Sequence, residues 1–347
     1  MANLTDKRIA VLGTGANGAA IAADIHRAGY DVVLIDQWAE HVEAMRENGV
    51  RVEMAHETQV TKVRAYHLSD VATFDALFDI VLLVIKAYDT PWACHLIKPC
   101  LAKEGVIAGV QNGMTVDAIA DAVGPERTIG CVIEITSQMF EPGIIQRESG
   151  PDKSWFAVGA IDEAAKVKEE DVRELLSCAG TAVLSDDIRS SKWMKLISNC
   201  TTLATTAIFG ATMADAAADP KMRAVMLRAG EECLLAGQEV GYKIQPIFGL
   251  SAEELEQRND LVDFMLDHMT GTFITPTTIT TILQDHMKNR RSEVGDVNGW
   301  VVEAREAAGA TARVNKVVVE LAGRIKRGEL EARPGNVELV WELVGEG

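Results

Sequence analysis

The sequence predicts an α/β protein, with a doubly wound parallel sheet in its N-terminal half and an all-α domain after it. In the first half, short β-branched segments alternate with helical stretches, which is the pattern of a parallel sheet. From residue 186 onward, the apolar residues follow the period of long helices. A glycine-rich turn stands directly after the first predicted strand, as in dinucleotide-binding sheets.

The predicted elements follow from these patterns in chain order. Strands are expected at residues 8–12, 31–35, 80–85, 106–110, 128–135, 143–147, 155–159 and 181–184, the last of which closes the sheet. Helices are expected at residues 191–209, 221–240, 252–269, 292–308 and 315–327, and residues 328–347 form an appended tail. We therefore place a dinucleotide-binding domain at residues 1–188 and a helical domain for substrate binding and dimerisation at residues 189–347.

Composition excludes several classes of protein. The formal net charge of −17 over 347 residues argues against nucleic acid and acidic membrane surfaces as partners, because both attract clustered cations. The N-terminus has no apolar segment of the signal-peptide kind, and the longest apolar run, residues 80–85, is too short to span a membrane. Six scattered cysteines form no C-x-x-C pair, so we expect reduced core thiols, no metal site and a cytoplasmic location.

The glycine-rich turn predicts the cofactor. Its residues are Gly13, Thr14, Gly15, Ala16, Asn17 and Gly18, with a strand before them, a helix after them, and an acidic residue, Asp36, 18 positions further on. This Rossmann-type arrangement lets the backbone approach a pyrophosphate at a helix N-terminus. A plain turn between strand and helix is the alternative.

Asp36 predicts NAD(H) in preference to NADP(H). A carboxylate at the end of the second strand accepts hydrogen bonds from ribose hydroxyls and repels a 2′-phosphate. No Lys or Arg stands between Asp36 and Met45 to bind such a phosphate.

Polar residues at three further places predict the substrate end of the site. Lys86 and Asn112 follow the third and fourth major strands, and the carboxyl ends of parallel strands face the ligand crevice, so we expect both near the nicotinamide. Lys195 and Asn199 are four residues apart on one helix face among apolar neighbours. A partly desolvated ammonium needs an anionic partner, so this face is expected to hold an anion.

These residues together resemble the ketopantoate reductase (2-dehydropantoate 2-reductase) family, over residues 8–327. The motifs that support the resemblance are Gly13/Gly15/Gly18, Lys86-Ala87, Asn112-Gly113-Met114, Trp193-Met194-Lys195-Leu196 with Asn199, Leu283-Gln284-Asp285, Ser292-Glu293-Val294 and Asn298-Gly299. Their order along the chain makes the resemblance specific.

The resemblance implies that Lys195 is the general acid, that Glu293 binds and orients the substrate, and that Asn112 and Asn199 are polar contacts. Hydride addition to a ketone puts negative charge on its oxygen, and an ammonium both stabilises that charge and supplies the proton. Glu293 in the same pocket would favour the protonated lysine. The alternatives are a lysine at a helix rim, a solvated glutamate at a helix start and, for Lys86, a strand-end cap.

The chain departs from the family pattern where the substrate would bind. Leu203 replaces a second asparagine one turn after Asn199, and Thr278 and Thr281 stand where the family offers Asn and Ser. Arg313 replaces a proline ahead of the last helix. A lost hydrogen-bonding group changes substrate preference strongly.

We therefore expect an NAD-dependent oxidoreductase of 2-keto and 2-hydroxy acids whose best substrate is not ketopantoate. The alternatives are a 2-dehydropantoate 2-reductase proper of pantothenate biosynthesis, a 3-hydroxyacid or opine-type dehydrogenase, and a regulatory NAD-binding module. A homodimer is expected if Val317, Val318 and Leu321 are exposed, and these residues are otherwise core.

Overall fold

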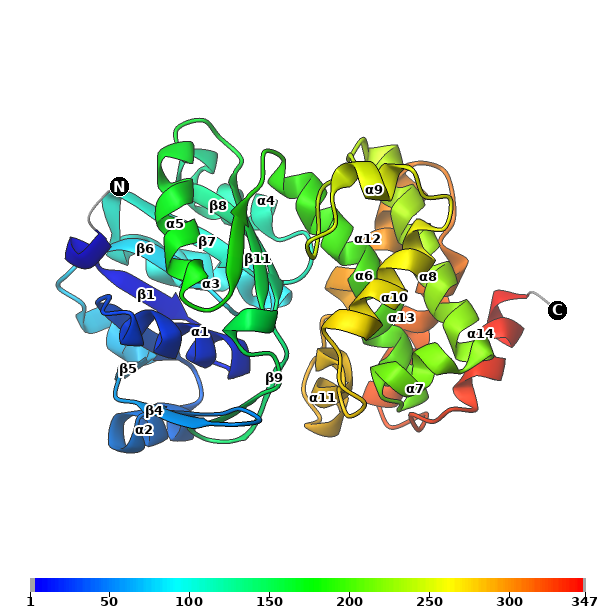
Figure 1. The fold of residues 1–347 in the computed structure, drawn as a ribbon, viewed down its shortest axis with the longest axis horizontal. Helices are drawn as coiled ribbons and strands as arrows, with labels where there is room; N and C mark the ends of the chain where they lie inside the picture. The colour runs from blue at the N-terminus through cyan, green and yellow to red at the C-terminus, as the bar shows by residue number, and fades with distance from the viewer. Residues whose placement is uncertain (1–3, 346–347) are drawn as a thin grey trace. The chain divides into compact units, whose positions relative to one another are not determined.

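The computed structural model describes residues 4–345 and divides into two units, whose elements are labelled in Figure 1. The first unit contains the residues up to Gln111 together with Thr115–Arg189. The second contains the short segment Asn112–Met114 and the residues from Ser190 onward. The segment Asn112–Met114 therefore follows a strand of the first unit in sequence but groups with the helices of the second.

An eight-stranded sheet forms the centre of the first unit within the described residues. From one edge to the other it contains β12 (Thr181–Leu184), β11 (Trp155–Ala160), β8 (Thr128–Glu134), β7 (Leu101–Val110), β6 (Phe78–Leu83), β1 (Ile9–Leu12), β2 (Val32–Asp36) and β5 (Arg64–His67). Strands β8 to β5 are parallel, β11 is antiparallel to β8, and β12 is parallel to β11. The predicted doubly wound sheet is confirmed, and the strand predicted at residues 181–184 is its edge.

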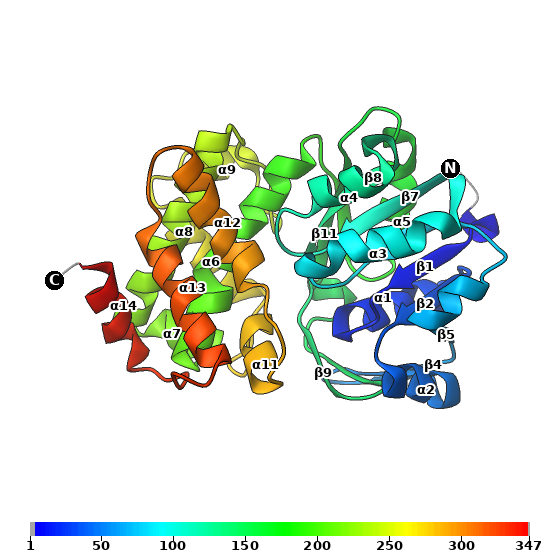
Figure 2. The same ribbon diagram turned by 180° about the vertical axis from the view of Figure 1, so that it is seen from behind.

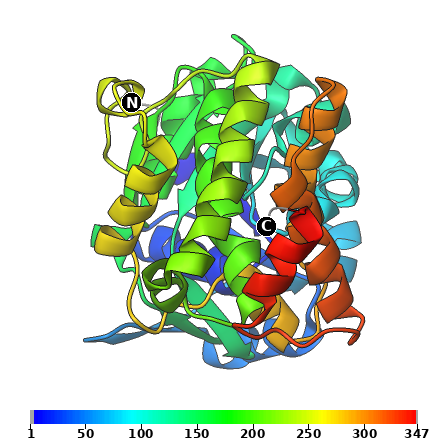
Figure 3. The ribbon, with the colours of Figure 1, turned by 90° about the vertical axis from the view of Figure 1, so that its right-hand side faces the viewer.

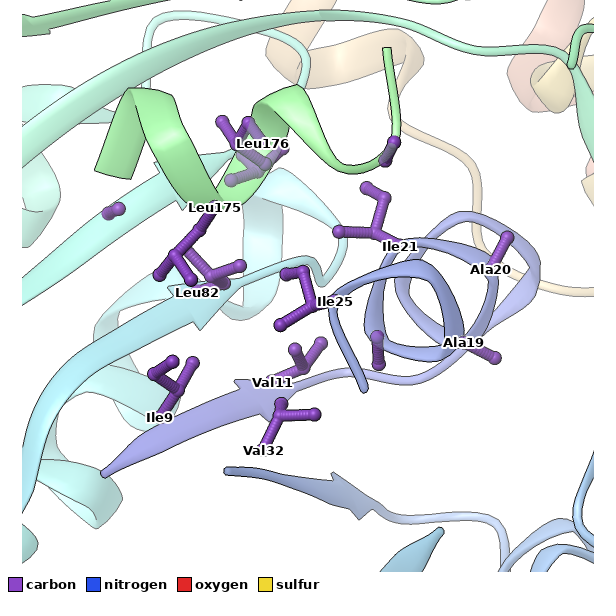
Figure 4. Packing of buried hydrophobic residues seen from close by; sticks show 14 of the residues in the cluster. Ile9, Val11, Ala19, Ala20, Ile21, Ile25, Val32, Leu82, Leu175 and Leu176 are labelled. Carbon is purple, nitrogen blue, oxygen red and sulfur yellow. The ribbon is translucent and has the colours of Figure 1, made fainter. Parts of the chain in front are cut away.

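Alternating side chains bury both faces of this sheet. Ile9 and Val11 face α1 (Ala16–Arg27) and α5 (Glu169–Ser177), as Figure 4 shows. Ala10 and Leu12 point to the opposite face, in a cluster with residues of α3 (Thr90–Ile97) and α4 (Val116–Val123). Figures 1 and 2 show these two pairs of helices from opposite sides. Successive side chains of a strand alternate in direction, so an apolar strand covered on both faces is apolar throughout.

A second sheet, which the sequence patterns did not predict, stands beside α2 (Ala39–Asn48). Its order is β4 (Thr58–Thr61), β3 (Val50–Glu53), β10 (Ile144–Arg147) and β9 (Ser137–Glu141). The strand predicted at residues 143–147 exists but belongs to this sheet, where Ile145 pairs with Val52. The strands are short and mixed in polarity, and their pairing is distant in sequence, so local periodicity cannot reveal it.

Helices make up the second unit, with α8 (Pro220–Val240) in contact with most of them. Helix α8 packs against α7 (Met213–Ala218), α10 (Leu261–Thr272), α12 (Val294–Ala307), α13 (Arg313–Lys326) and α14 (Asn336–Val344). Figure 3 shows α8 between α10 on one side and α12 and α13 on the other. Helix α6 (Ile188–Phe209) and the short helices α9 (Ala252–Glu256) and α11 (Thr281–Met287) complete the unit.

Two expectations about this unit need correction. The single helix expected at residues 252–269 is two helices, α9 and α10, because the polar run 257–260 contains Asn and Asp, which favour turns. Within the expected tail, residues 336–344 form α14, which buries Val337, Val340 and Val344 in the core of its own chain, and residues 346–347 lie outside the described residues.

The apolar residues considered for a dimer surface are also core. Val317, Val318 and Leu321 of α13 are all less than 9% exposed, and they belong to the same apolar cluster as α14. They therefore provide no exposed face for a second subunit.

The contact between α6 and α8 predicts a strict requirement for glycine at position 237. A Cβ atom there would lie 1.9 Å from Nε1 of Trp193, whose indole N–H donates to the Cys233 carbonyl at 3.0 Å. We expect Gly237→Ala to lower the free energy of unfolding by about 1–3 kcal/mol through overpacking.

Denaturant unfolding measures this change. Gly271→Ala is the control, because Gly271 is also helical but has no heavy atom within 4 Å of its Cβ position. Alanine there should leave stability unchanged or raise it slightly. Equal stability of the two variants would contradict the close packing.

Candidate active site

Two glycines of the turn after β1 allow close packing between strand and helix. Gly13 has a φ of +92°, and a Cβ on it would lie 2.3 Å from Cγ2 of Ile85, which follows the neighbouring strand β6. A Cβ on Gly18 would lie 2.0 Å from the Gly13 carbonyl oxygen. Any side chain at either position would push α1 away from the sheet.

The middle glycine, Gly15, leaves space for a ligand. Its Cβ position has no protein heavy atom within 4 Å. Its φ of −57° is allowed for any residue, so the backbone conformation does not require a glycine here. Gly15 is the N-cap of α1, and no side chain caps this end of the helix within the described residues. The free backbone N–H groups of a first helical turn bind phosphate oxygens, so the turn fits the pyrophosphate of a dinucleotide.

Asp36, at the end of β2, is held against this turn. One carboxylate oxygen accepts the backbone N–H of Thr14 at 2.6 Å and its hydroxyl at 3.1 Å. The other accepts the N–H of Trp38 at 2.9 Å. A carboxylate has about four lone-pair sites, so these three bonds orient Asp36 and leave capacity for a ribose hydroxyl.

His41 is a component of this region that the sequence reasoning missed. Its Nε2–H donates to the Thr14 carbonyl at 2.7 Å, and its Nδ1 accepts the N–H of Gly143 at 2.8 Å. Burial lowers the pKa of His41, which keeps the ring neutral as this pair of bonds requires. The ring connects the glycine-rich turn to the second sheet, and a lone histidine in a helix gives no local signal of that role.

Asn17 and Lys86 were also predicted to contact the cofactor. Asn17 belongs to the glycine-rich turn itself, whereas Lys86 follows the neighbouring strand β6. Asn17, in the first turn of α1, accepts a hydrogen bond through Oδ1 from the Ser137 hydroxyl of β9. Lys86 is half-buried after β6 and directly follows Ile85, which contacts the turn. The structure therefore brings Gly13 to Gly18 and Asp36 together, with Lys86 at the end of the adjacent strand.

Helix α6 carries the residues predicted for the substrate end. It is buried at every position from Ser190 to Phe209, although its sequence includes many polar side chains. Four threonine hydroxyls satisfy themselves by donating to carbonyls four residues earlier, from Thr201, Thr202, Thr205 and Thr206. Lys195 and Asn199 use longer side chains to reach beyond the helix.

Asn199 and Asn112 form a direct contact within the second unit. Nδ2 of Asn199 donates to Oδ1 of Asn112 at 3.1 Å, and Asn199 is only 2% exposed. Asn112 therefore uses its amide oxygen in this bond, and its own NH₂ group is a donor. The structure brings these two predicted site residues together across 87 positions of sequence.

Phe248 faces Lys195 and was not predicted. The Lys195 ammonium lies 5.0 Å from the centroid of the Phe248 ring, in cation–π range. Phe248 has a φ of +56° in a tight turn between Ile247 and Leu250, followed by Gly249 at +86°. A left-handed conformation of a bulky residue costs about 1–2 kcal/mol. The Phe-Gly pair between two aliphatic residues signals a turn but not the side chain that it would face.

Glu293 is the N-cap of α12 and is 4% exposed. Helix α12 reaches α6 through Asn298, whose Nδ2 lies 3.5 Å from the Cys200 carbonyl and 2.8 Å from Oδ1 of Asn315. The carboxylate is thus buried at the start of a helix that meets α6 one residue beyond Asn199. The alternative of a solvated glutamate does not fit this burial.

The threonines considered for substrate binding lie beside Leu203. Thr280, a residue not predicted, donates to the Leu203 carbonyl at 3.0 Å, and its hydroxyl oxygen lies 3.1 Å from that of Thr206. The Thr278 hydroxyl accepts the backbone N–H of Thr275 at 2.9 Å and so stabilises the loop before α11. Oγ1 of Thr281 is buried and has no hydrogen-bond partner among the described residues.

Leu203 itself is 8% exposed and packs in the apolar cluster that includes Ile282 and Leu283. Its side chain offers no hydrogen bond where the family pattern has an amide. Among Thr278, Thr280 and Thr281, only Thr281 has a buried hydroxyl without a hydrogen-bond partner among the described residues.

Other classes of site receive little support from the described residues. All six cysteines are free thiols, five of them buried, as expected for core residues. Within residues 4–345, no group of three or more His, Cys, Asp or Glu is arranged to hold a metal ion. A search of the same residues finds no helix long and apolar enough to cross a membrane.

These features define a class of protein: a nicotinamide-dinucleotide oxidoreductase with a cofactor sheet and a helical unit bearing a buried lysine. Family models narrow the class. The model described as "Ketopantoate reductase PanE/ApbA" matches residues 9–162, and the model of the family's C-terminal domain matches residues 187–326. The chain belongs to the ketopantoate reductase family and is an oxidoreductase of CH–OH groups that reduces 2-keto acids with NAD(P)H.

Individual relatives agree with this assignment. A 2-dehydropantoate 2-reductase of Archaeoglobus fulgidus is 25% identical over 93% of this chain and 99% of its own length. One from Mesorhizobium japonicum is 28% identical over 68% of this chain and 77% of its own. A ketopantoate reductase structure from Ralstonia eutropha is 26% identical, with a TM-score of 0.77 over 93% and 99% of the two chains.

A D-mandelate dehydrogenase solved with NADH and anilino(oxo)acetate has the same fold. Its TM-score is 0.80 and its sequence identity 20%, over 93% of this chain and 99% of that one.

The three glycines of the turn predict different effects of substitution. We expect Gly15→Ala to fold normally and to bind NADH at least about tenfold more weakly, because its methyl group occupies the open space at the helix N-terminus. Fluorescence titration measures the affinity, and the melting temperature reports the fold.

Gly18→Ala is the matched comparison. Its methyl group would overlap the Gly13 carbonyl, so the melting temperature should fall. Unchanged NADH affinity in a folded Gly15→Ala protein would contradict the assignment of the pyrophosphate site.

Proposed function

We propose that this protein interconverts a 2-keto acid and a 2-hydroxy acid with NAD(H), and that Lys195 is the general acid of the reduction. The main support is the buried polar group of the second unit, in which Lys195 and Asn199 lie one turn apart on α6 and Asn199 bonds Asn112. Burying an ammonium costs free energy unless it is paired, so a lysine buried one turn from a bonded pair of amides is a candidate for binding or chemistry.

The proposed mechanism gives each polar residue a separate task. The reduced nicotinamide, when bound, supplies the hydride. Lys195 donates a proton to the carbonyl oxygen and stabilises the charge that develops there. The NH₂ group of Asn112 and the amide of Asn199 are donors for the oxygens of the 2-keto acid, and Glu293 orients the substrate.

Several observations support NAD(H) over NADP(H). Asp36 stands beside the glycine-rich turn with lone pairs for a ribose, and its charge opposes a 2′-phosphate. The first cation after it in the chain, Arg46, is already paired with Glu43 and Asp70, each at 2.7 Å.

The substrate proposed is a 2-keto acid more apolar or bulkier than ketopantoate. The Leu203 side chain forms no hydrogen bond where a second asparagine is usual, and the Thr278 hydroxyl is used within its own loop. The buried Thr281 hydroxyl has no hydrogen-bond partner among the described residues, which supports it as a substrate contact. The D-mandelate dehydrogenase of the same fold is named for an aromatic 2-hydroxy acid, which supports this choice of substrate.

Reduction of 2-dehydropantoate itself is the second candidate, favoured by the names of the curated relatives. A 3-hydroxyacid or opine-type dehydrogenase fits the buried Lys195, Asn199 and Glu293 less well. A cytoplasmic location agrees with the six free thiols. A homodimer also remains a proposal, now resting on exposed apolar side chains such as Leu235, Val240 and Leu343 rather than on α13.

A screen of substrates with both cofactors tests this proposal directly. We expect a higher kcat/KM with NADH than with NADPH, and faster turnover of 2-oxoisovalerate or phenylglyoxylate than of ketopantoate. A preference for NADPH would contradict the role given to Asp36. A clear preference for ketopantoate would favour the second candidate.

Replacement of Lys195 tests the chemistry. Lys195→Ala should lower kcat by about 10² or more and leave the Kd for NADH within about threefold, because the lysine acts on the reacting oxygen. Lys221→Ala is the control, since Lys221 forms an exposed ion pair with Glu338. A normal kcat in Lys195→Ala would reject the general-acid role.

A further inference from the structure

We propose that Phe248 is a positioning residue for Lys195, whose ring holds the lysine ammonium where it protonates the substrate. The proposal rests on the general-acid role proposed for Lys195. The ammonium lies 5.0 Å from the ring centroid, and the two residues are only 8% and 3% exposed. Cation–π attraction is strongest where water is excluded, so this contact is stronger than one at the surface.

The backbone around Phe248 fixes the direction of its ring. The turn is closed by two hydrogen bonds between Ile247 and Leu250, at 3.1 and 2.8 Å, and Phe248 occupies a left-handed position within it. Nε2 of His268 donates to the Phe248 carbonyl at 3.1 Å, and the Phe273 ring packs with a centroid distance of 5.5 Å. A bulky residue keeps a positive φ only where its surroundings enforce it, and such residues concentrate at functional sites.

An aromatic ring can hold the Lys195 ammonium in position without accepting its proton. Lysine has a flexible four-carbon stem, and small displacements of a catalytic group lower kcat strongly. The negative face of an aromatic ring attracts the ammonium without accepting its proton, so the lysine stays able to donate. A carboxylate in the same place would hold the lysine in its protonated form and make it a weaker acid.

The test compares variants that keep or remove the π face. Phe248→Leu fills similar space and has a similar backbone preference, but it has no ring, whereas Phe248→Tyr keeps the ring. We expect Phe248→Leu to lower kcat roughly five- to thirtyfold and to leave KM for the 2-keto acid within about twofold. Phe248→Tyr should keep kcat within about threefold. The substrate is the fastest acid among ketopantoate, 2-oxoisovalerate and phenylglyoxylate.

Phe264→Leu is the matched control. It removes a cation–π contact from the same part of the chain, in which Arg258 lies 3.9 Å from the Phe264 ring centroid, but does not touch Lys195. Its kcat should equal that of the unmodified protein. If Phe248→Leu does not fold, Phe248→Met provides the same comparison.

The outcomes separate this proposal from the function it rests on. Normal kcat in Phe248→Leu together with an inactive Lys195→Ala would overturn the positioning role and leave the general acid intact. Equal losses in the Leu and Tyr variants would also overturn it, because packing alone would then explain both. Normal kcat in Lys195→Ala would overturn the proposed function, and the positioning role with it.

Discussion

The burial of α6 is the constraint on which the substrate half of this protein depends. From Ser190 to Phe209 no position of the helix is exposed, yet the helix includes two ammonium groups, Lys192 and Lys195, an amide and four threonine hydroxyls. Each buried polar group must find a partner or pay for its desolvation. The threonines bond to their own helix, Asn199 reaches Asn112, and Lys195 lies against the ring of Phe248.

In the first unit, the structure around the glycine-rich turn depends on a different constraint, which is how closely one backbone segment approaches another. Gly13 and Gly18 bring α1 against the end of β1, while Gly15 leaves the helix N-terminus open. Asp36 accepts the N–H of Thr14 and His41 donates to its carbonyl, so the shape of the turn is maintained by groups from β2 and α2. The N-terminus of α1 is thereby preorganised for an anion.

Much of this could be predicted because the signals are local. The strand, glycine turn, helix and Asp36 stand in a fixed order within 36 residues, and the pairing of Lys195 with Asn199 needs only the helical period. The second sheet could not be predicted, because β3 meets β10 across some 90 residues and neither strand has a distinctive pattern. The break between α9 and α10 was missed although its turn-forming residues are visible in the sequence.

By itself, the sequence determined the class of fold, the glycine-rich turn after the first strand and the helix face that bears Lys195 and Asn199, since each depends on residue type at short spacing. Only the tertiary structure decided what surrounds them. In the second unit Phe248 lies against Lys195, and in the first unit His41 bonds the Thr14 carbonyl, because segments distant in sequence fold onto these residues. Residues 336–344 became core rather than tail, because the apolar face of α14 finds its complement on helices more than a hundred residues earlier as well as nearby.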